Sequence, residues 1–131
     1  MTMPVLAPVE RTAVLDGAAT AAYADLFHAL SDPTRLAILQ HLATGPHRVC
    51  DLVDHLGFAQ STVSKHLACL RGCGLAELRT EGRASWFSLA EPRLLADLLR
   101  GAQAMLAATG EQATLCEHLM HPGAAETTDG D

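Results

Sequence analysis

Two short helical patterns separated by a brief turn constrain the fold of this chain more than any other feature. The first covers about residues 48–56, and the second starts near Gln60. Both repeat apolar side chains at the spacing of a helix with one buried face. Gly57 lies between them, and glycine commonly ends a helix. Two short helices joined by a turn of three or four residues predict a helix-turn-helix.

The second helix has a polar flank beside its buried stripe. Gln can make two hydrogen bonds to adenine, Ser accepts several partners, and Lys can bind guanine or a phosphate. The candidate DNA contacts on this helix are Gln60, Ser61, Ser64, Lys65 and His66. A plain helical hairpin with a solvated polar face is the alternative interpretation. The elements that follow in the chain favour DNA binding.

A short β-hairpin is predicted directly after this helix. Residues 75–80 and 83–89 have strand-forming side chains, and the Glu-Gly pair between them suits a tight turn. Such a hairpin would be the wing of a winged helix-turn-helix. Arg79 and Arg83 near its tip are candidates for contacts with DNA phosphates.

Three further helices complete the expected fold. Residues 17–30 and 33–43 have helical patterns, and Asp32 followed by Pro33 is a strong start signal for the second. A helix over residues 92–108 has a wide apolar face, which predicts pairing with its copy in a homodimer. The expected fold class is mainly α with a small β-hairpin: a winged helix-turn-helix that dimerises through its terminal helices.

The chain divides into three parts. Residues 1–16 contain two prolines and no clear period, and we interpret them as a flexible N-terminal arm. Residues 17–110 form the DNA-binding and dimerisation domain. Residues 111–131 form a tail with a candidate metal-ligand cysteine and an acidic end, which we expect to be disordered.

Charge and composition limit the possible functions. The 131 residues have a net charge of −6 at pH 7, but the span 44–90 holds five Lys and Arg against four Asp and Glu. This local balance permits DNA contact through a few cations, with an affinity that falls as salt rises. No apolar run reaches the roughly 18 residues of a membrane span, and no signal-peptide pattern is present, so we expect a cytoplasmic protein without membrane contact.

Four cysteines are the second feature with chemical content. In a reducing cytosol they more often indicate buried thiols, metal ligands or redox sensing than disulfides. Cys69 and Cys73 lie four residues apart on the predicted DNA-reading helix, a spacing that rises about 6 Å and returns to nearly the same face. Two such thiols can bind one soft metal ion. The alternative is a pair of small apolar residues near a helix end.

The chain resembles the ArsR/SmtB family of dimeric metal-responsive repressors in the order of its elements and in two motifs. These motifs are DPTRLAIL at residues 32–39 and STVSKHL at residues 61–67, and the hairpin adds EGR. The resemblance covers about residues 18–108. It implies a homodimer that binds double-stranded operator DNA, expected to be an imperfect inverted repeat, and that leaves the DNA when a metal or another inducer binds.

Within that family, CLRGC in the DNA-reading helix with a later lone cysteine is similar to the CmtR-type cadmium and lead sensors. This resemblance implies Cys69, Cys73 and Cys116 as metal ligands and Cd²⁺ or Pb²⁺ as the inducer. Three thiolates suit these soft ions and also tolerate Zn²⁺. Glu117, His118 and His121 are candidates to complete or replace the set, or solvated tail residues. Cys50 is interpreted as a core or spare thiol.

Two other functions stay open from the sequence. The same fold could sense thiol oxidation or persulfides through a cysteine pair without a metal. A cysteine-based enzyme or a metal buffer that binds no DNA is the remaining alternative. No catalytic base stands beside a thiol in the sequence, so we do not expect an enzyme. His28, His41 and His55 are isolated in the sequence and are interpreted as surface or half-buried side chains.

Overall fold

The computed structural model describes residues 16–123, and the structural statements below concern this part of the chain. The predicted N-terminal arm, except Asp16, and the acidic end from residue 124 lie outside it. The elements in chain order are α2 (Gly17–Leu30), α3 (Pro33–Leu42), α4 (Val49–Leu56), α5 (Gln60–Gly72), β1 (Ala76–Glu81), β2 (Ala84–Leu89), α6 (Pro92–Ala108) and α7 (Glu117–Met120).

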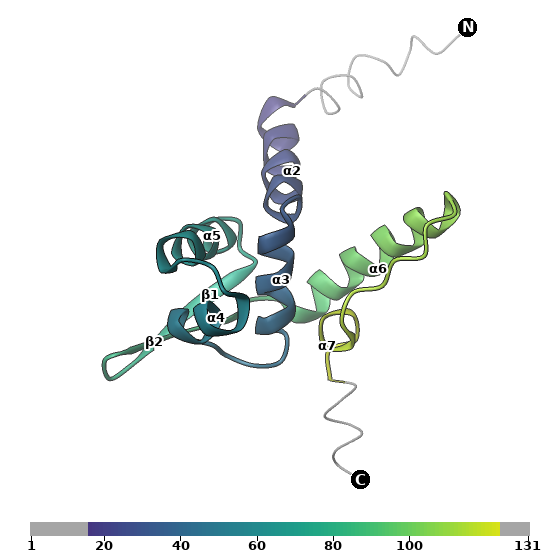
Figure 1. Cartoon of the computed structure of the whole chain (residues 1–131). Coiled ribbons are helices and arrows are strands. Elements are labelled where there is room, and N and C mark those ends of the chain that lie inside the picture. Colours follow the sequence, from purple (N-terminus) through teal and green to yellow (C-terminus); the bar gives the residue numbers. More distant parts are fainter. Residues whose placement is uncertain (1–15, 124–131) are drawn as a thin grey trace, which may run out of the picture.

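These elements confirm the predicted fold class, mostly helical with one antiparallel hairpin. Helices α2 and α3 follow one another along a central column (Figure 1). Helices α4 and α5 and the hairpin lie on one side of this column, and α6 with α7 lies on the other. No helix among the described residues is long and apolar enough to cross a membrane.

The helix starts follow the capping signals in the sequence. The Asp32 carboxylate accepts a hydrogen bond from the Arg35 N–H at 2.9 Å, and Pro33 occupies the first turn of α3. Asp16 caps α2 in the same way, through the N–H of Ala18 at 3.0 Å. Helix α5 begins after Ala59, which has no side-chain cap. The DNA-reading helix therefore starts without the stabilisation that Ser or Thr would supply.

The turn between α4 and α5 depends on one glycine. Gly57 has a backbone φ of 77°, in the left-handed region that residues with a Cβ rarely adopt. Its N–H donates to the Val53 carbonyl at 2.9 Å and closes the last turn of α4. Three residues, 57–59, then lead into α5. The predicted helix-turn-helix is thereby confirmed.

The hairpin is registered one residue later than the sequence predicted. Ala76 pairs with Leu89 and Glu81 pairs with Ala84, so the turn consists of Gly82 and Arg83 rather than Glu81 and Gly82. Gly82 has φ of 60°, and a glycine at the first central position suits a two-residue hairpin turn. The shift places Arg83 at the tip of the wing.

The core lies between α3, α4, α5 and the hairpin. Val63, Leu67 and Leu70 of α5 are at most 1% exposed, which confirms the predicted buried stripe. The short helix α7 also contributes to the core, since Leu119 and Met120 are at most 2% exposed. The segment before residue 124 is thus anchored to the domain by apolar burial.

Candidate DNA-reading surface and metal-binding thiols

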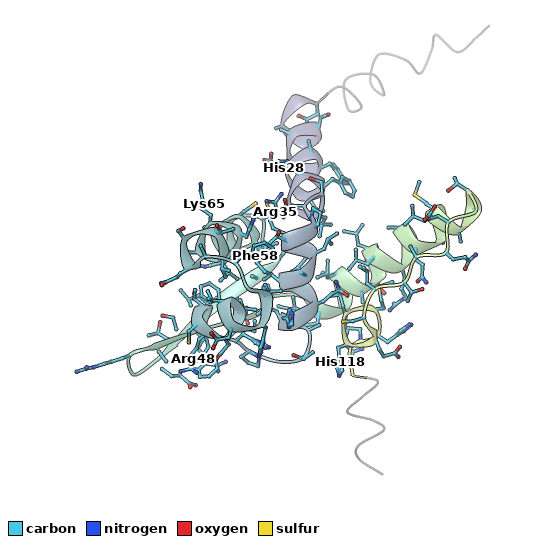
Figure 2. All side chains as sticks on the ribbon, in the orientation of Figure 1. His28, Arg35, Arg48, Phe58, Lys65 and His118 are labelled. Carbon is cyan, nitrogen blue, oxygen red and sulfur yellow. The ribbon has the colours of Figure 1, made fainter. Side chains whose placement is uncertain are left out.

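Four of the five DNA-contact candidates on α5 lie on its exposed face. Gln60, Ser61, Ser64 and Lys65 are all exposed, opposite the buried stripe of the helix. Figure 2 shows Lys65 pointing away from the body of the protein. A helix with this face outward can enter a major groove without rearranging the core.

His66, the fifth candidate, contacts the protein itself. Its Nδ1 lies 3.3 Å from Nη1 of Arg35, and its Nε2 lies 3.9 Å from the Asp32 carboxylate. The side chain is only 20% exposed. His66 therefore links α5 to the start of α3, and its contact with DNA stays a prediction.

Arg35 is a functional residue that the sequence analysis missed. It is buried, and its guanidinium donates to the Ala29 and His28 carbonyls at the end of α2, each at 2.7 Å. These bonds satisfy acceptors that a helix end leaves free. Together with the contact to His66, they join α2, α3 and α5. A charged residue within the apolar pattern of α3 was the available signal.

The wing carries the two predicted arginines. Arg83 is exposed at the tip, whereas Arg79 is exposed but paired with the Glu81 carboxylate at 3.1 Å. Arg48 adds a cation that the sequence analysis did not assign to DNA. It pairs with Asp51 at 3.1 Å and lies 5.2 Å from the centre of the Trp86 ring, so it links α4 to the wing.

Cys69 and Cys73 both line one cleft between α5 and α2. The cleft has a volume of about 440 Å³, and its α2 wall includes Asp25 and His28. Both thiols are half-buried, and the Cys73 sulfur lies 3.6 Å from the Asp25 carbonyl oxygen. The two soft donors that the helical spacing brings to one face therefore open into one space large enough for an ion.

The environment of Cys73 keeps its thiol protonated. Burial raises the pKa of Cys73, and the nearby Cys69 and Asp25 raise it further through charge repulsion. A side-chain hydrogen bond with Cys69 acts in the same direction on the pKa of Cys73. A metal ion that binds here must displace protons.

Cys116 lies elsewhere in the same protomer. It precedes α7, where its N–H donates to the Gln40 side-chain oxygen at 2.9 Å and its sulfur lies 3.8 Å from the Gln40 carbonyl oxygen. It does not line the cleft of Cys69 and Cys73. The structure thus brings two of the three predicted ligands together. The third, Cys116, is held against Gln40 of α3.

The remaining thiol and the histidines depart from the sequence analysis. Cys50 is exposed at the start of α4 and is not a core residue. His41 and His55, interpreted as isolated, lie together with His47. The nitrogen atoms that these three rings can offer to a metal all lie within 4.8 Å of one another. The exposure of His41 and His55 agrees with the interpretation as half-buried and surface side chains, but their cluster was not predicted because the fold joins residues that are distant in the chain.

Comparison with known proteins gives the same classification. A family model described as bacterial regulatory protein, arsR family, matches residues 32–77. The chain is 41% identical over 107 residues to the HTH-type transcriptional regulator CmtR of Mycobacterium tuberculosis, covering 82% of this chain and 91% of that protein. It is 37% identical over 103 residues to the probable mercury resistance operon repressor of Streptomyces lividans, covering 79% and 80%.

Solved structures agree. The NMR structure of the cadmium metal sensor CMTR from Mycobacterium tuberculosis matches with a TM-score of 0.52 and 42% identity, over 72% of this chain and 98% of that one. The homodimeric winged helix-turn-helix domain of a possible ArsR-family regulator from Mycobacterium bovis matches with a TM-score of 0.64 and 27% identity, over 79% and 94%. The chain therefore belongs to the ArsR family of DNA-binding transcriptional regulators, which are not enzymes.

Proposed function

We propose that this chain is a homodimeric repressor that binds operator DNA and is released when Cys69, Cys73 and Cys116 bind Cd²⁺ or Pb²⁺. The observation that carries the proposal is the cleft between α2 and α5. Two half-buried thiols open into it from the helix that also carries most of the DNA-contact candidates. Soft sulfur donors suit these ions, and the names of two relatives refer to cadmium and mercury.

DNA binding would depend on the exposed face of α5 and on the wing. Gln60, Ser61 and Ser64 lie in its first two turns and can reach base edges, while Lys65 and the wing arginine Arg83 can reach phosphates. Two such helices in a dimer would read half-sites about one helical turn apart. The operator should therefore be an inverted repeat.

A second copy of the chain would cover an exposed apolar face formed by α2 and α6. Five large side chains on this face are 44–75% exposed: Tyr23, Phe27, Leu94, Met105 and Leu106. An adjoining apolar pocket of about 340 Å³ has walls from both helices. Contiguous exposed apolar surface of this kind usually marks an interface. The matching winged helix-turn-helix domain from Mycobacterium bovis is described as homodimeric, which supports a dimer.

The third ligand must move before it can reach the cleft. Cys116 would have to leave Gln40, because α7, which it precedes, lies on the opposite side of the central column from α5 (Figure 1). Because α2 forms both a wall of the cleft and part of the apolar face, the tail of the partner subunit would approach the same cleft in a dimer. We therefore assign the third thiol to the partner subunit's Cys116.

The coupling to DNA follows from the position of the thiols. A tail tethered to α5 would restrain the helix that enters the groove, and three thiolates on a divalent ion would leave net negative charge near the DNA. Both effects disfavour the DNA-bound geometry. Coupling of about 1–3 kcal/mol would lower DNA affinity roughly 5- to 150-fold.

Fluorescence anisotropy can test this proposal with a duplex selected from a random-sequence pool. We expect tight binding by the metal-free dimer and weaker binding at saturating Cd²⁺. Cys69→Ser should bind the duplex but fail to release it. Cys50→Ser is the matched control, because it removes an exposed thiol outside the cleft. Equal DNA affinity with and without Cd²⁺ would refute the proposal.

Thiol oxidation is the second candidate, because Cys69 and Cys73 line the same cleft. The raised pKa of Cys73 counts against it, since the thiolate is the species that reacts. Mass spectrometry of mildly oxidised protein discriminates the two candidates. A Cys69–Cys73 or Cys116 crosslink that abolishes DNA binding would favour redox sensing, and unmodified thiols would favour the metal.

A further inference from the structure

Three histidines from separate parts of the fold converge beside the helix-turn-helix. His41 lies in the last turn of α3, His47 in the loop before α4, and His55 in the last turn of α4. Their ring centres are 5.3–6.2 Å apart, and their candidate ligand nitrogens all lie within 4.8 Å of one another. The cluster is distinct from the thiol cleft, which none of the three lines.

His47 is held in an orientation typical of a metal ligand. Its Nδ1 lies 2.8 Å from the Gly45 carbonyl oxygen, so Nδ1 carries the proton and Nε2 keeps its lone pair. A carbonyl partner of this kind fixes the tautomer of most metal-binding histidines. The backbone of His47 also exchanges two hydrogen bonds with Phe87 of β2, at 2.9 and 2.8 Å. The loop that presents this ring is therefore anchored to the wing.

The other two rings differ in exposure to solvent. His41 is half-buried against the fold, and the exposed His55 ring stacks on it with an angle of 25° between the planes. In a tetrahedral zinc site, bonds of about 2.0–2.1 Å place the ligand nitrogens roughly 3.3 Å apart. The nitrogens, now within 4.8 Å of one another, would have to approach by up to about 1.5 Å through rotation of the exposed His55 side chain and adjustment of the His41 and His47 rings.

We propose that His41, His47 and His55 bind a Zn²⁺ ion in a site separate from the thiol cleft. Three imidazoles and one water complete a tetrahedral shell, and nitrogen donors suit Zn²⁺ better than Cd²⁺ or Pb²⁺. The ion would join the ends of α3 and α4 to the loop that is bonded to β2. Occupancy therefore stabilises the first helix of the helix-turn-helix relative to the wing. The proposal does not depend on release of DNA by the thiols.

The test uses full-length protein in which all four cysteines are replaced by serine. Calorimetric titration with Zn²⁺ should show one ion bound per protomer, with a rise in the melting temperature. His55→Gln in this background should weaken Zn²⁺ binding at least about tenfold, since even loss of an outer-shell partner has that effect. His28→Gln is the matched control, an exposed histidine outside the cluster, and should bind Zn²⁺ unchanged.

Absence of Zn²⁺ binding at a large molar excess, or equal affinity in His55→Gln, would overturn the proposal. A nitrogen-detected NMR experiment on wild-type protein covers the case in which the cysteine-free variant does not fold. The thiols are first saturated with Cd²⁺, and Zn²⁺ is then added. The ring signals of His41, His47 and His55 should shift together and stop shifting at one Zn²⁺ per protomer. Shifts confined to His118 and His121 would instead place the ion on the tail and refute the site.

Discussion

The thiol cleft and the histidine cluster are two potential metal sites assembled in opposite ways. Cys69 lies in the last turn of α5 and Cys73 caps its end, with its N–H donating to the Cys69 carbonyl at 3.1 Å, so the helical spacing alone brings them together. His41, His47 and His55 come from two helices and a loop, and only the packing of α3, α4 and β2 joins them. A site within one helix can be predicted from a sequence, whereas a site between elements requires the fold.

The two sites also differ in donor chemistry and position. The cleft offers soft sulfur donors on the helix that carries the DNA-contact candidates. The cluster offers nitrogen donors at the ends of α3 and α4 and in the loop that is bonded to β2. Metal at the cleft should therefore oppose DNA binding, and metal at the cluster should stabilise the fold. The predictions below test whether the sites are separate, in order of decreasing effect.

Exchange of one ligand at each site gives the largest expected effect. Cys69→Ser should weaken Cd²⁺ binding about 100-fold or more, beyond the loss from an outer-shell partner, because a hydroxyl is a poor ligand for a soft ion. His55→Gln should leave Cd²⁺ binding unchanged. The measurement is a competition titration followed by sulfur-to-metal absorption. If His55→Gln weakens Cd²⁺ binding as strongly as Cys69→Ser, the two sites are not independent.

The pH dependence of metal affinity should give the next largest difference between the two sites. Because the pKa of Cys73 is raised, its thiol stays protonated at neutral pH and competes with the metal. Cd²⁺ affinity should rise about tenfold per pH unit for each displaced proton, and should keep rising above pH 8. Zn²⁺ affinity at the cluster should level off above about pH 7, since imidazoles are neutral there. Titrations from pH 6 to 9 check both, and a flat Cd²⁺ profile would contradict the thiol assignment.

Sequence reasoning predicted much of this molecule because local signals dominate it. The start of α3 at Asp32 and Pro33, and the buried stripe of α5, follow from capping and periodicity. The hairpin turn was predicted one residue too early because a single glycine decides its position, through the positive φ of Gly82.

Contacts between distant residues were not predictable in the same way. Cys116 bonds to Gln40, which lies 76 positions earlier in the chain, and Arg35 reaches the end of α2 and His66 at once. Spacing along the chain carries no information about such pairs. The sequence therefore indicated which residues could be ligands, but not that one protomer keeps the third thiol away from the first two.

Removal of the contact between Cys116 and Gln40 should have a smaller effect on Cd²⁺ affinity. If Cys116 must leave Gln40 to reach the cleft, Gln40→Ala removes a hydrogen bond that competes with the metal. One such bond contributes about 0.5–1.5 kcal/mol, so Cd²⁺ should bind roughly 2- to 10-fold more tightly. Calorimetry with Cd²⁺ measures the change. Unchanged affinity would mean that Cys116 does not join the cleft, and the assignment of the third ligand would be withdrawn.

The smallest expected effect is on the free energy of unfolding, and it comes from the start of α5. The thiols lie toward its end, and its start lacks a side-chain cap. Ala59→Ser should supply that cap and raise the free energy of unfolding by about 0.5–1 kcal/mol. Ala68→Ser, an exposed position within the same helix, is the control and should be neutral or slightly destabilising. Urea unfolding compares the variants, and equal stabilisation by both would show that capping is not the cause.

The central claim, that the cleft and the DNA-reading face of α5 are coupled, has a reciprocal form. Linkage requires that DNA weaken Cd²⁺ binding by the same factor by which Cd²⁺ weakens DNA binding. The most direct measurement is therefore the Cd²⁺ affinity of the free dimer and of the dimer saturated with its selected duplex. We predict that Cd²⁺ binds roughly 5- to 150-fold more weakly to the DNA-bound dimer. Equal Cd²⁺ affinities in the two states would contradict the account.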